Sequence, residues 1–219
     1  MCRFEDFYCA GQDCVLSLVM ALLRSTLVLL LLLAITQVSA ATIKQREITM
    51  GETSELWIIV KGTIEQGDTV SFLAALNSKD RPVTVWLESS GGSAAEGLAI
   101  ARMIKTLGLN TYVHSDGKCD SICSIMFLSG KRKMAVIDGK IGVHTAYDPK
   151  TKRPDAYGNA LIAWYLGSLD YPEELVDLWI RTKPDRLVNL NNGPNTSLRL
   201  GIETVQPVQV PLLDRLLSD

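Results

Sequence analysis

The chain has 219 residues, a formal net charge of −2, 47% apolar residues and 21% charged residues. These proportions are those of a soluble globular domain, and the near-neutral balance excludes a basic surface for nucleic acid. The length accommodates one domain, or one domain with a tail.

The tail lies at the N-terminus, where residues 20–40 have the layout of a secretory signal peptide. One positive charge, Arg24, precedes an apolar core at 27–35, and small residues stand at the last and third-last positions before the end at Ala40. A positive start, an apolar core and a small-residue end are typical of a cleaved signal. We therefore expect cleavage after Ala40, leaving residues 41–219 in the periplasm or outside the cell.

An uncleaved anchor in the inner membrane is the alternative for residues 20–40. The apolar core is short for a bilayer span, which needs about 20 residues, but apolar residues begin already at Val15. Residues 1–19 carry acidic residues and cysteines where a signal peptide has positive charge. We therefore interpret them as an extension that precedes the true translation start at Met20.

Residues 41–219 predict one domain in which strands and helices alternate. Apolar, β-branched runs predict strands at 56–62, 82–89, 110–115, 133–138 and 140–144, the last two flanking an Asp138-Gly139 turn. Helical spacing of apolar residues predicts helices at 69–78, 94–108, 121–130, 155–168, 172–182 and 196–202. This order is typical of an α/β fold with a mainly parallel sheet.

Two cysteines, Cys119 and Cys123, remain once the N-terminal segment is removed. A single pair in an exported chain is a candidate disulfide, and a spacing of four puts both residues on one helix face. A regular helix restricts disulfide geometry, so two small buried residues are the alternative. We expect no metal site, because the chain adds only His114 and His144, which show no ligand spacing.

A Gly-Gly turn separates a predicted strand from a predicted helix at residues 90–93. In a parallel sheet, ligands meet the carboxyl ends of the strands. Gly91 and Gly92 allow backbone N–H groups to approach a ligand closely, and the helix that follows Ser93 adds a positive dipole end. Most turns of this kind are only turns, so the pattern alone does not settle its role.

Ser121 and His144 are the candidate reactive residues. Ser121 begins a predicted buried helix, where it is either a helix cap or a nucleophile. The N–H of Ile122 could join that of Gly91 or Gly92 in an oxyanion hole. His144 ends a predicted strand, where it is either a hydrogen-bonded structural residue or a general base, a role for which histidine is the commonest residue.

The order of these elements resembles the Clp protease proteolytic subunit and the wider Clp/crotonase fold. The resemblance spans roughly residues 56–205 and rests on "ESSGGSAAEGLAIARMI", "DSICSIMFLSG", "IGVHTA" and "SLRLGIETV". The C-x-S-x-C pattern and the signal peptide together look like predicted periplasmic Clp-like proteins of bacteria. The resemblance implies a single Clp/crotonase-like domain with repeated β-β-α and β-α units.

The resemblance also implies the roles of the site residues. Ser121 is the nucleophile, His144 the base and Asp185 the residue that orients the imidazole, with Asn189 or Asn191 as alternatives to Asp185. The residues implied at the substrate are Gly92 and Ile122 in the oxyanion hole, and Gly91 and Ser93 along the substrate backbone. A disulfide between Cys119 and Cys123 would brace the serine loop.

Three departures from the family pattern accompany this match. Ser90 replaces a proline of the glycine turn, Cys123 replaces a small residue, and His144 lacks a following Gln-Pro. A Ser/Lys dyad, as in related signal peptide peptidases, would need Lys118 or Lys140, and we expect both to be exposed.

The resulting hypothesis is an exported serine hydrolase, most simply a peptidase, that uses no cofactor. Its expected partners are a peptide or protein substrate and further copies of the chain, with no nucleic acid. Homo-oligomers are implied through helices like those at 155–182, where Trp164, Tyr165 and Trp179 are candidate interface residues. A non-catalytic peptide- or protein-binding member of the fold is the alternative. Acyl chemistry on a coenzyme A thioester is a further alternative, and it would need a cytoplasmic cofactor.

Overall fold

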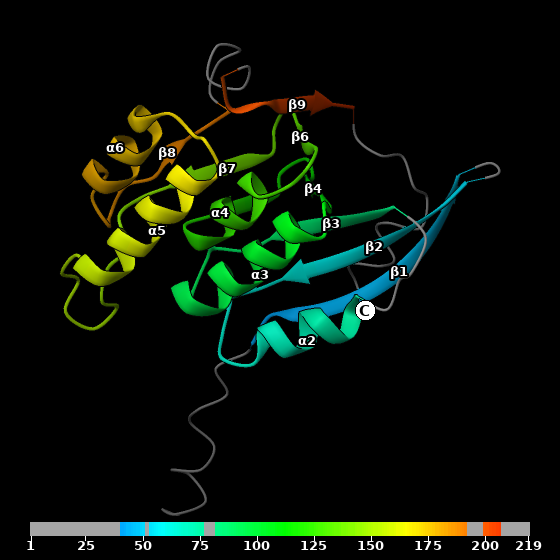
Figure 1. The fold of residues 1–219 in the computed structure, drawn as a ribbon, viewed down its shortest axis with the longest axis horizontal. Helices are drawn as coiled ribbons and strands as arrows, with labels where there is room; N and C mark the ends of the chain where they lie inside the picture. Colours follow the sequence, from blue (N-terminus) through cyan, green and yellow to red (C-terminus); the bar gives the residue numbers. More distant parts are fainter. Residues whose placement is uncertain (1–39, 51–52, 77–81, 192–198, 207–219) are drawn as a thin grey trace, which may run out of the picture. The chain divides into compact units, whose positions relative to one another are not determined.

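The computed structural model describes residues 40–50, 53–76, 82–191 and 199–206, all within one compact unit, Ser39–Asp219 (Figure 1). The strands are β1 (Thr42–Met50), β2 (Thr53–Lys61), β3 (Val83–Glu88), β4 (Asn110–Val113), β5 (Lys118–Asp120), β6 (Lys133–Val136), β7 (Lys140–Val143), β8 (Val188–Asn189) and β9 (Ile202–Val205). The helices are α2 (Asp68–Ala75), α3 (Ala94–Thr106), α4 (Ile122–Leu128), α5 (Ala156–Ser168) and α6 (Glu173–Arg181).

The larger sheet has the strand order β1-β2-β3-β4-β6-β9. β1 and β2 are antiparallel, and every other neighbouring pair in this sheet is parallel. A smaller sheet has the order β5-β7-β8. The predicted α/β fold with a mainly parallel sheet is therefore confirmed.

β2 shows that both faces of the larger sheet are covered, because every residue of Leu56–Val60 is buried. Leu56, Ile58 and Val60 pack into the main core, whereas Trp57 and Ile59 pack into a second cluster. Side chains of a strand alternate between its two faces. A run that is apolar at every position is therefore typical of a strand covered on both faces.

α2, α3 and α4 lie side by side over one face of the larger sheet (Figure 1). Gly97 allows α3 to approach the start of α4 closely, because a Cβ at this position would overlap the Ile122 side chain. The carboxyl end of β3 and the start of α4 are thereby held together, and these are the places where the sequence predicts the site.

The two strands predicted around Asp138-Gly139 are present as β6 and β7, but they do not pair with each other as a hairpin. β6 pairs with β4 and β9, whereas β7 pairs with β5 and β8 in the other sheet. The segments β4–β5 and β6–β7 run in parallel, and Lys140 N–H donates to the Gly117 carbonyl (2.9 Å) where both pass between the sheets. Each strand therefore pairs with a parallel partner distant in sequence instead of with its neighbour in the chain.

The start of the described chain is fastened to the turn before α2. Ala41 N–H donates to Asp68 Oδ2 (3.3 Å), and Glu65 N–H donates to the same oxygen (2.8 Å). Asp68 is only 2% exposed. The carboxylate thus joins the beginning of β1 to the Glu65 backbone.

The predicted segments 1–19 and 20–39 lie outside the described residues, as does most of the helix predicted at 196–202. Among the residues that the structure describes, no helix is long and apolar enough to cross a membrane.

Candidate active site

Ser121 stands alone between the end of β5 and the start of α4, in a strained backbone conformation. Its φ is 57° and its ψ is −130°. Non-glycine residues rarely adopt positive φ, and such strain is found where a site requires it. The Ser121 N–H donates to the Gly142 carbonyl (2.9 Å), and its side chain makes no capping hydrogen bond to α4. Ser121 therefore does not act as a side-chain helix cap, and its hydroxyl is not used in capping α4.

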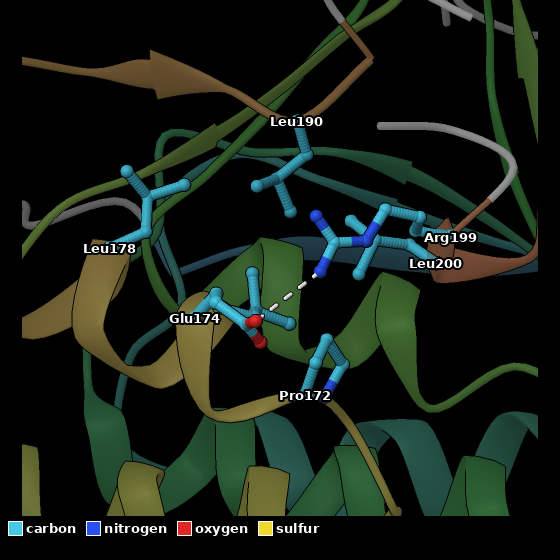
Figure 2. Close-up of a pocket in the computed structure, with 7 residues that line it drawn as sticks. Pro172, Glu174, Leu178, Leu190, Arg199 and Leu200 are labelled. Atoms are coloured by element: carbon cyan, nitrogen blue, oxygen red, sulfur yellow. Dashed lines mark ion pairs between the residues drawn. The ribbon is translucent and has the colours of Figure 1, made fainter. Parts of the chain in front are cut away.

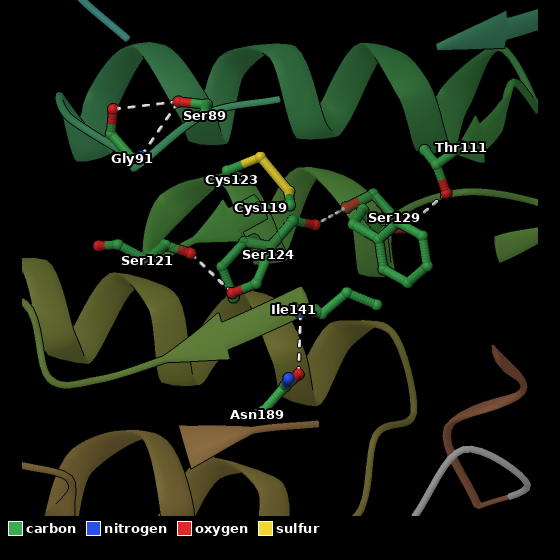
Figure 3. Close-up of a disulfide and its surroundings, with 12 residues drawn as sticks. Ser89, Gly91, Thr111, Cys119, Ser121, Cys123, Ser124, Ser129, Ile141 and Asn189 are labelled. Carbon is green, nitrogen blue, oxygen red and sulfur yellow. Dashed lines mark hydrogen bonds between the residues drawn. A yellow bond between two sulfur atoms is a disulfide. The ribbon is translucent and has the colours of Figure 1, made fainter. Parts of the chain in front are cut away.

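Cys119 and Cys123 form a disulfide that encloses Ser121 (Figure 3). Their Cα atoms are 5.0 Å apart, within the usual range for disulfides. The sequence suggested two cysteines on one helix, but Cys119 lies in β5 and Cys123 in the first turn of α4. The chain bends at Ser121, which removes the restriction that a regular helix would impose. Both cysteines are fully buried.

Gly91 lies directly against Ser121. Its φ is +97°, and a Cβ at this position would lie 2.6 Å from the Ser121 Cβ and 3.0 Å from the Asp120 carbonyl oxygen. Any side chain would therefore both strain the backbone and displace the serine.

The residues on either side of Gly92 bond to Ile64, so that the N–H and C=O of Gly92 itself face away from Ile64. Ile64 N–H donates to the Gly91 carbonyl (2.8 Å), and Ser93 N–H donates to the Ile64 carbonyl (2.7 Å). Gly92 is the bridge residue between these two bonds. In a parallel pair, the N–H and C=O of that residue point to the opposite side.

Gly92 and Ile122 are well placed for the predicted oxyanion hole. Gly92 N–H faces away from Ile64, and Ile122 is the first residue of α4, so its N–H has no intrahelical acceptor. Both residues line the cavity that Ser121 also lines. Ser93 lines this cavity too, and its hydroxyl accepts from Glu96 N–H (3.4 Å) as the cap of α3.

His144 follows β7 directly and is held by its neighbour. Its Nδ1 lies 2.8 Å from the Thr145 carbonyl oxygen. A carbonyl can only accept, so Nδ1 carries the proton and Nε2 keeps its lone pair in the neutral ring. The ring is 8% exposed and packs against Tyr147, with the ring centroids 5.4 Å apart. This tautomer is the one that a general base acting through Nε2 requires.

Ser121 and His144 line one cavity of about 490 Å³. Its walls come from the turn after β2, the glycine turn, the start of α4 and the segment after β7. Besides His144, the ionisable side chains that line it are Glu65, Tyr147 and Asp155. The structure therefore brings together the nucleophile, the base and both oxyanion residues of the sequence-based hypothesis.

Asp185 is not brought to this cavity. It is exposed in the turn after α6, and it is not among the cavity-lining residues. The alternatives are engaged elsewhere: Asn189 Oδ1 accepts from Ile141 N–H (2.9 Å), and Asn191 Nδ2 donates to the Gly139 carbonyl. The hydrogen-bond partner of His144 Nδ1 is therefore the Thr145 carbonyl, and not the side chain of Asp185, Asn189 or Asn191.

Three side chains near the site were not identified from the sequence: Asp120, Tyr147 and Asn159. Burial raises the pKa of Asp120, while Lys118 and His144 act in the opposite direction. The sequence signal for Asp120 was its place next to Ser121. The signal for Asn159 was an amide inside an otherwise apolar helix.

A second cavity, of about 190 Å³, lies between α6 and the segments at Leu190 and Leu200 (Figure 2). An ion pair between Glu174 and Arg199 (3.6 Å) spans it. Its lining contains no serine, cysteine or histidine, so it offers neither a nucleophile of this kind nor an imidazole base. Lys118 and Lys140 are both exposed, as expected, and do not line the Ser121 cavity.

Residues 36–149 match the Clp protease family. The chain belongs to the Clp protease family. The matched range contains Gly91, Gly92, Ser121 and His144 and ends before Asp185. The resemblance stated from the sequence is thus confirmed at the level of the family.

Among solved structures, this Clp protease family member is similar to the ClpP protease catalytic domain from Plasmodium falciparum. The two share 21% identity with a TM-score of 0.52, over 70% of this chain and 86% of that one. At this identity the likeness shows the fold. A search among curated proteins found no match.

Proposed function

We propose that the chain is a serine peptidase in which Ser121 is the nucleophile and His144 the general base. The observation that carries this proposal is the strained, uncapped Ser121 in one cavity with a histidine whose Nε2 is free. A nucleophile on a strained turn from strand to helix is a recurring hydrolase arrangement. Membership of the Clp protease family makes peptides the expected substrates.

The reaction follows from the roles of these groups. Ser121 Oγ attacks the scissile carbonyl carbon while His144 Nε2 accepts its proton. The N–H groups of Gly92 and Ile122 stabilise the negative oxygen of the tetrahedral intermediate. The imidazolium then gives the proton to the leaving amine, and water releases the acyl group by the same steps in reverse.

The Thr145 carbonyl takes over part of the work of a triad acid. It selects the tautomer, which is a main task of the acid in a triad. As a neutral dipole, it stabilises the imidazolium less than a carboxylate does. Loss of the acid from a triad can cost about 10⁴ in rate, so we expect this peptidase to be slow. Asp185 remains a prediction for the acid that no observation places at the ring.

The peptidase is proposed to act outside the cytoplasm, in the periplasm or as a secreted protein. The support is the signal-like segment 20–40 and the disulfide at Ser121, because such bonds persist in oxidising compartments. Retention in the inner membrane by an uncleaved signal is the alternative. The proposed chemistry uses neither a metal nor a nucleotide.

An extended peptide and further copies of the chain are the proposed partners. The backbone at Gly91 and Gly92 could pair with a substrate strand. Of the three aromatic residues considered for an oligomer interface, Tyr165 and Trp179 are buried in the core, whereas Trp164 is 61% exposed on α5. Trp164 therefore remains the candidate for contact between subunits.

A non-catalytic binding protein on the same fold is the second candidate function. The observation in its favour is that the cavity-lining residues do not include Asp185. Such a protein would hold a peptide at the glycine turn without cutting it.

Labelling of the full-length chain with a fluorophosphonate probe decides between the two functions. We expect labelling of the wild type, none in Ser121→Ala, and a rate lower by roughly 10²–10⁴ in His144→Ala. Ser90→Ala removes another serine of the cavity and His114→Ala the other histidine of the chain, so both controls should label normally. A folded wild type that stays unlabelled favours the binding protein, and labelling that survives in Ser121→Ala refutes the assignment.

A further inference from the structure

Asn159 on α5 holds the segment that follows His144. It is only 8% exposed. Its Oδ1 accepts from Ala146 N–H (2.8 Å) and from Thr145 Oγ1 (3.0 Å). Its Nδ2 donates to the carbonyls of Ala146 (2.9 Å) and Asp155 (2.7 Å). All four hydrogen-bonding positions of the amide are therefore filled, and only one orientation of the amide satisfies these partners.

These bonds act on the peptide unit that orients the base. The Thr145 carbonyl and the Ala146 N–H belong to one planar peptide group. His144 Nδ1 donates to the carbonyl end, and Asn159 Oδ1 accepts from the N–H end. Asn159 thus fixes the plane of this peptide unit. A hydrogen bond at one end of a peptide also polarises the other end and strengthens it as an acceptor.

The preceding peptide unit, between His144 and Thr145, is held by the residue that follows α6. Thr145 N–H donates to the Thr182 carbonyl (2.9 Å). Thr145 and Thr182 are both buried, so solvent competes little with these bonds. The carbonyl that selects the tautomer is therefore a fixed part of the fold.

We propose that Asn159 is a positioning residue for His144. It orients the Thr145–Ala146 peptide, whose carbonyl keeps the proton on Nδ1 and leaves Nε2 as the base. Its effect on catalysis rests on the proposed peptidase function, whereas its effect on the tautomer does not. A merely structural Asn159 would change stability without changing the ring.

The test is ¹⁵N NMR of the imidazole in the full-length chain. The sequence has two histidines, so a His114→Ala background leaves His144 as the single signal. We expect Nδ1 to be protonated and Nε2 unprotonated at neutral pH. In Asn159→Ala the same spectrum should show a mixture of tautomers, and fluorophosphonate labelling should slow by up to roughly 10²-fold, the cost of a catalytic group misplaced by about 1 Å.

Ser129→Ala is the matched control. Ser129 is 1% exposed and bonds to the Ile125 carbonyl (2.7 Å) and to Tyr165 Oη (2.9 Å). Its loss should lower the melting temperature and leave the His144 spectrum and the labelling rate unchanged. An Asn159→Ala protein with the native tautomer would overturn the proposal.

Two further outcomes keep the proposal separate from the peptidase function. If Asn159→Ala does not fold, the wild-type spectrum alone decides, because a wild type with Nδ1 unprotonated contradicts the proposed role. If the wild type shows the expected tautomer and no labelling, the peptidase function fails and the positioning role stands.

Discussion

Substitution of Gly91 by alanine should damage the site and the fold together. The backbone at φ +97° costs a non-glycine residue about 1–3 kcal/mol. The new Cβ would lie 2.6 Å from the Ser121 Cβ and 3.0 Å from the Asp120 carbonyl oxygen. Overpacking of this kind adds about 1–3 kcal/mol. The serine must move to relieve it, and a displacement near 1 Å can cost roughly 10² in rate.

Gly67→Ala is the control, because Gly67 has nearly the same φ, +98°, and nothing within 4 Å of the added Cβ. Urea unfolding of both variants should give a free energy of unfolding that is lower for Gly91→Ala by about 1–3 kcal/mol. Fluorophosphonate labelling should be nearly normal in Gly67→Ala and lost or strongly slowed in Gly91→Ala. Equal stabilities, or normal labelling of Gly91→Ala, would refute the argument that Gly91 supports Ser121.

Three further predictions concern the bonds and charges around the site and the sheet edge. Replacement of Cys119 and Cys123 by alanine removes a cross-link between residues four apart and should cost about 2 kcal/mol by loop entropy. It should also slow labelling; unchanged melting and labelling would show that the bond does not brace Ser121. Because burial raises the pKa of Asp120, the stabilisation by its proton is present in acid and lost as pH rises through the raised pKa. Asp120→Asn should therefore melt higher than the wild type at neutral pH and equally in acid, and a variant that melts lower throughout would contradict this. The exposed pair Arg132–Glu203 (2.7 Å) should be worth at most about 1 kcal/mol, so Glu203→Gln should lower stability slightly at low salt and not at 1 M salt, as urea titrations at both salts would show.

The sequence was sufficient to predict the elements that depend on local pattern. The apolar run at 56–62 indicated a buried strand, and the glycine pair at 91–92 indicated a turn where backbone N–H groups can approach a ligand. Ser121 and His144 were identified because their residue types stand at the ends of such elements. The structure places both residues in the lining of one cavity.

The features that could not be predicted depend on contacts between segments that are distant in the sequence. The strained Ser121 backbone directly follows β5, which pairs with β7, and no local pattern predicts a sheet of such short strands. The role of Asn159 likewise cannot be predicted locally, because it depends on the packing of α5 against the residues after β7. The family resemblance implied Asp185 as the acid, but its exposed position in the turn after α6 depends on how α6 ends, which no local pattern predicts.

The hydrogen bond between Ala41 and Asp68 connects the start of the described chain to the wall of the Ser121 cavity. If the proposed cleavage after Ala40 takes place, the chain begins with the α-amino group of Ala41, and the ordinary pKa of such a group is about 8. The backbone donor at 3.3 Å from Asp68 would then be a cation beside a nearly fully buried carboxylate. The same carboxylate holds the Glu65 N–H, and Glu65 lines the Ser121 cavity. The charge of such an N-terminus would lie one carboxylate away from the backbone of a cavity-lining residue.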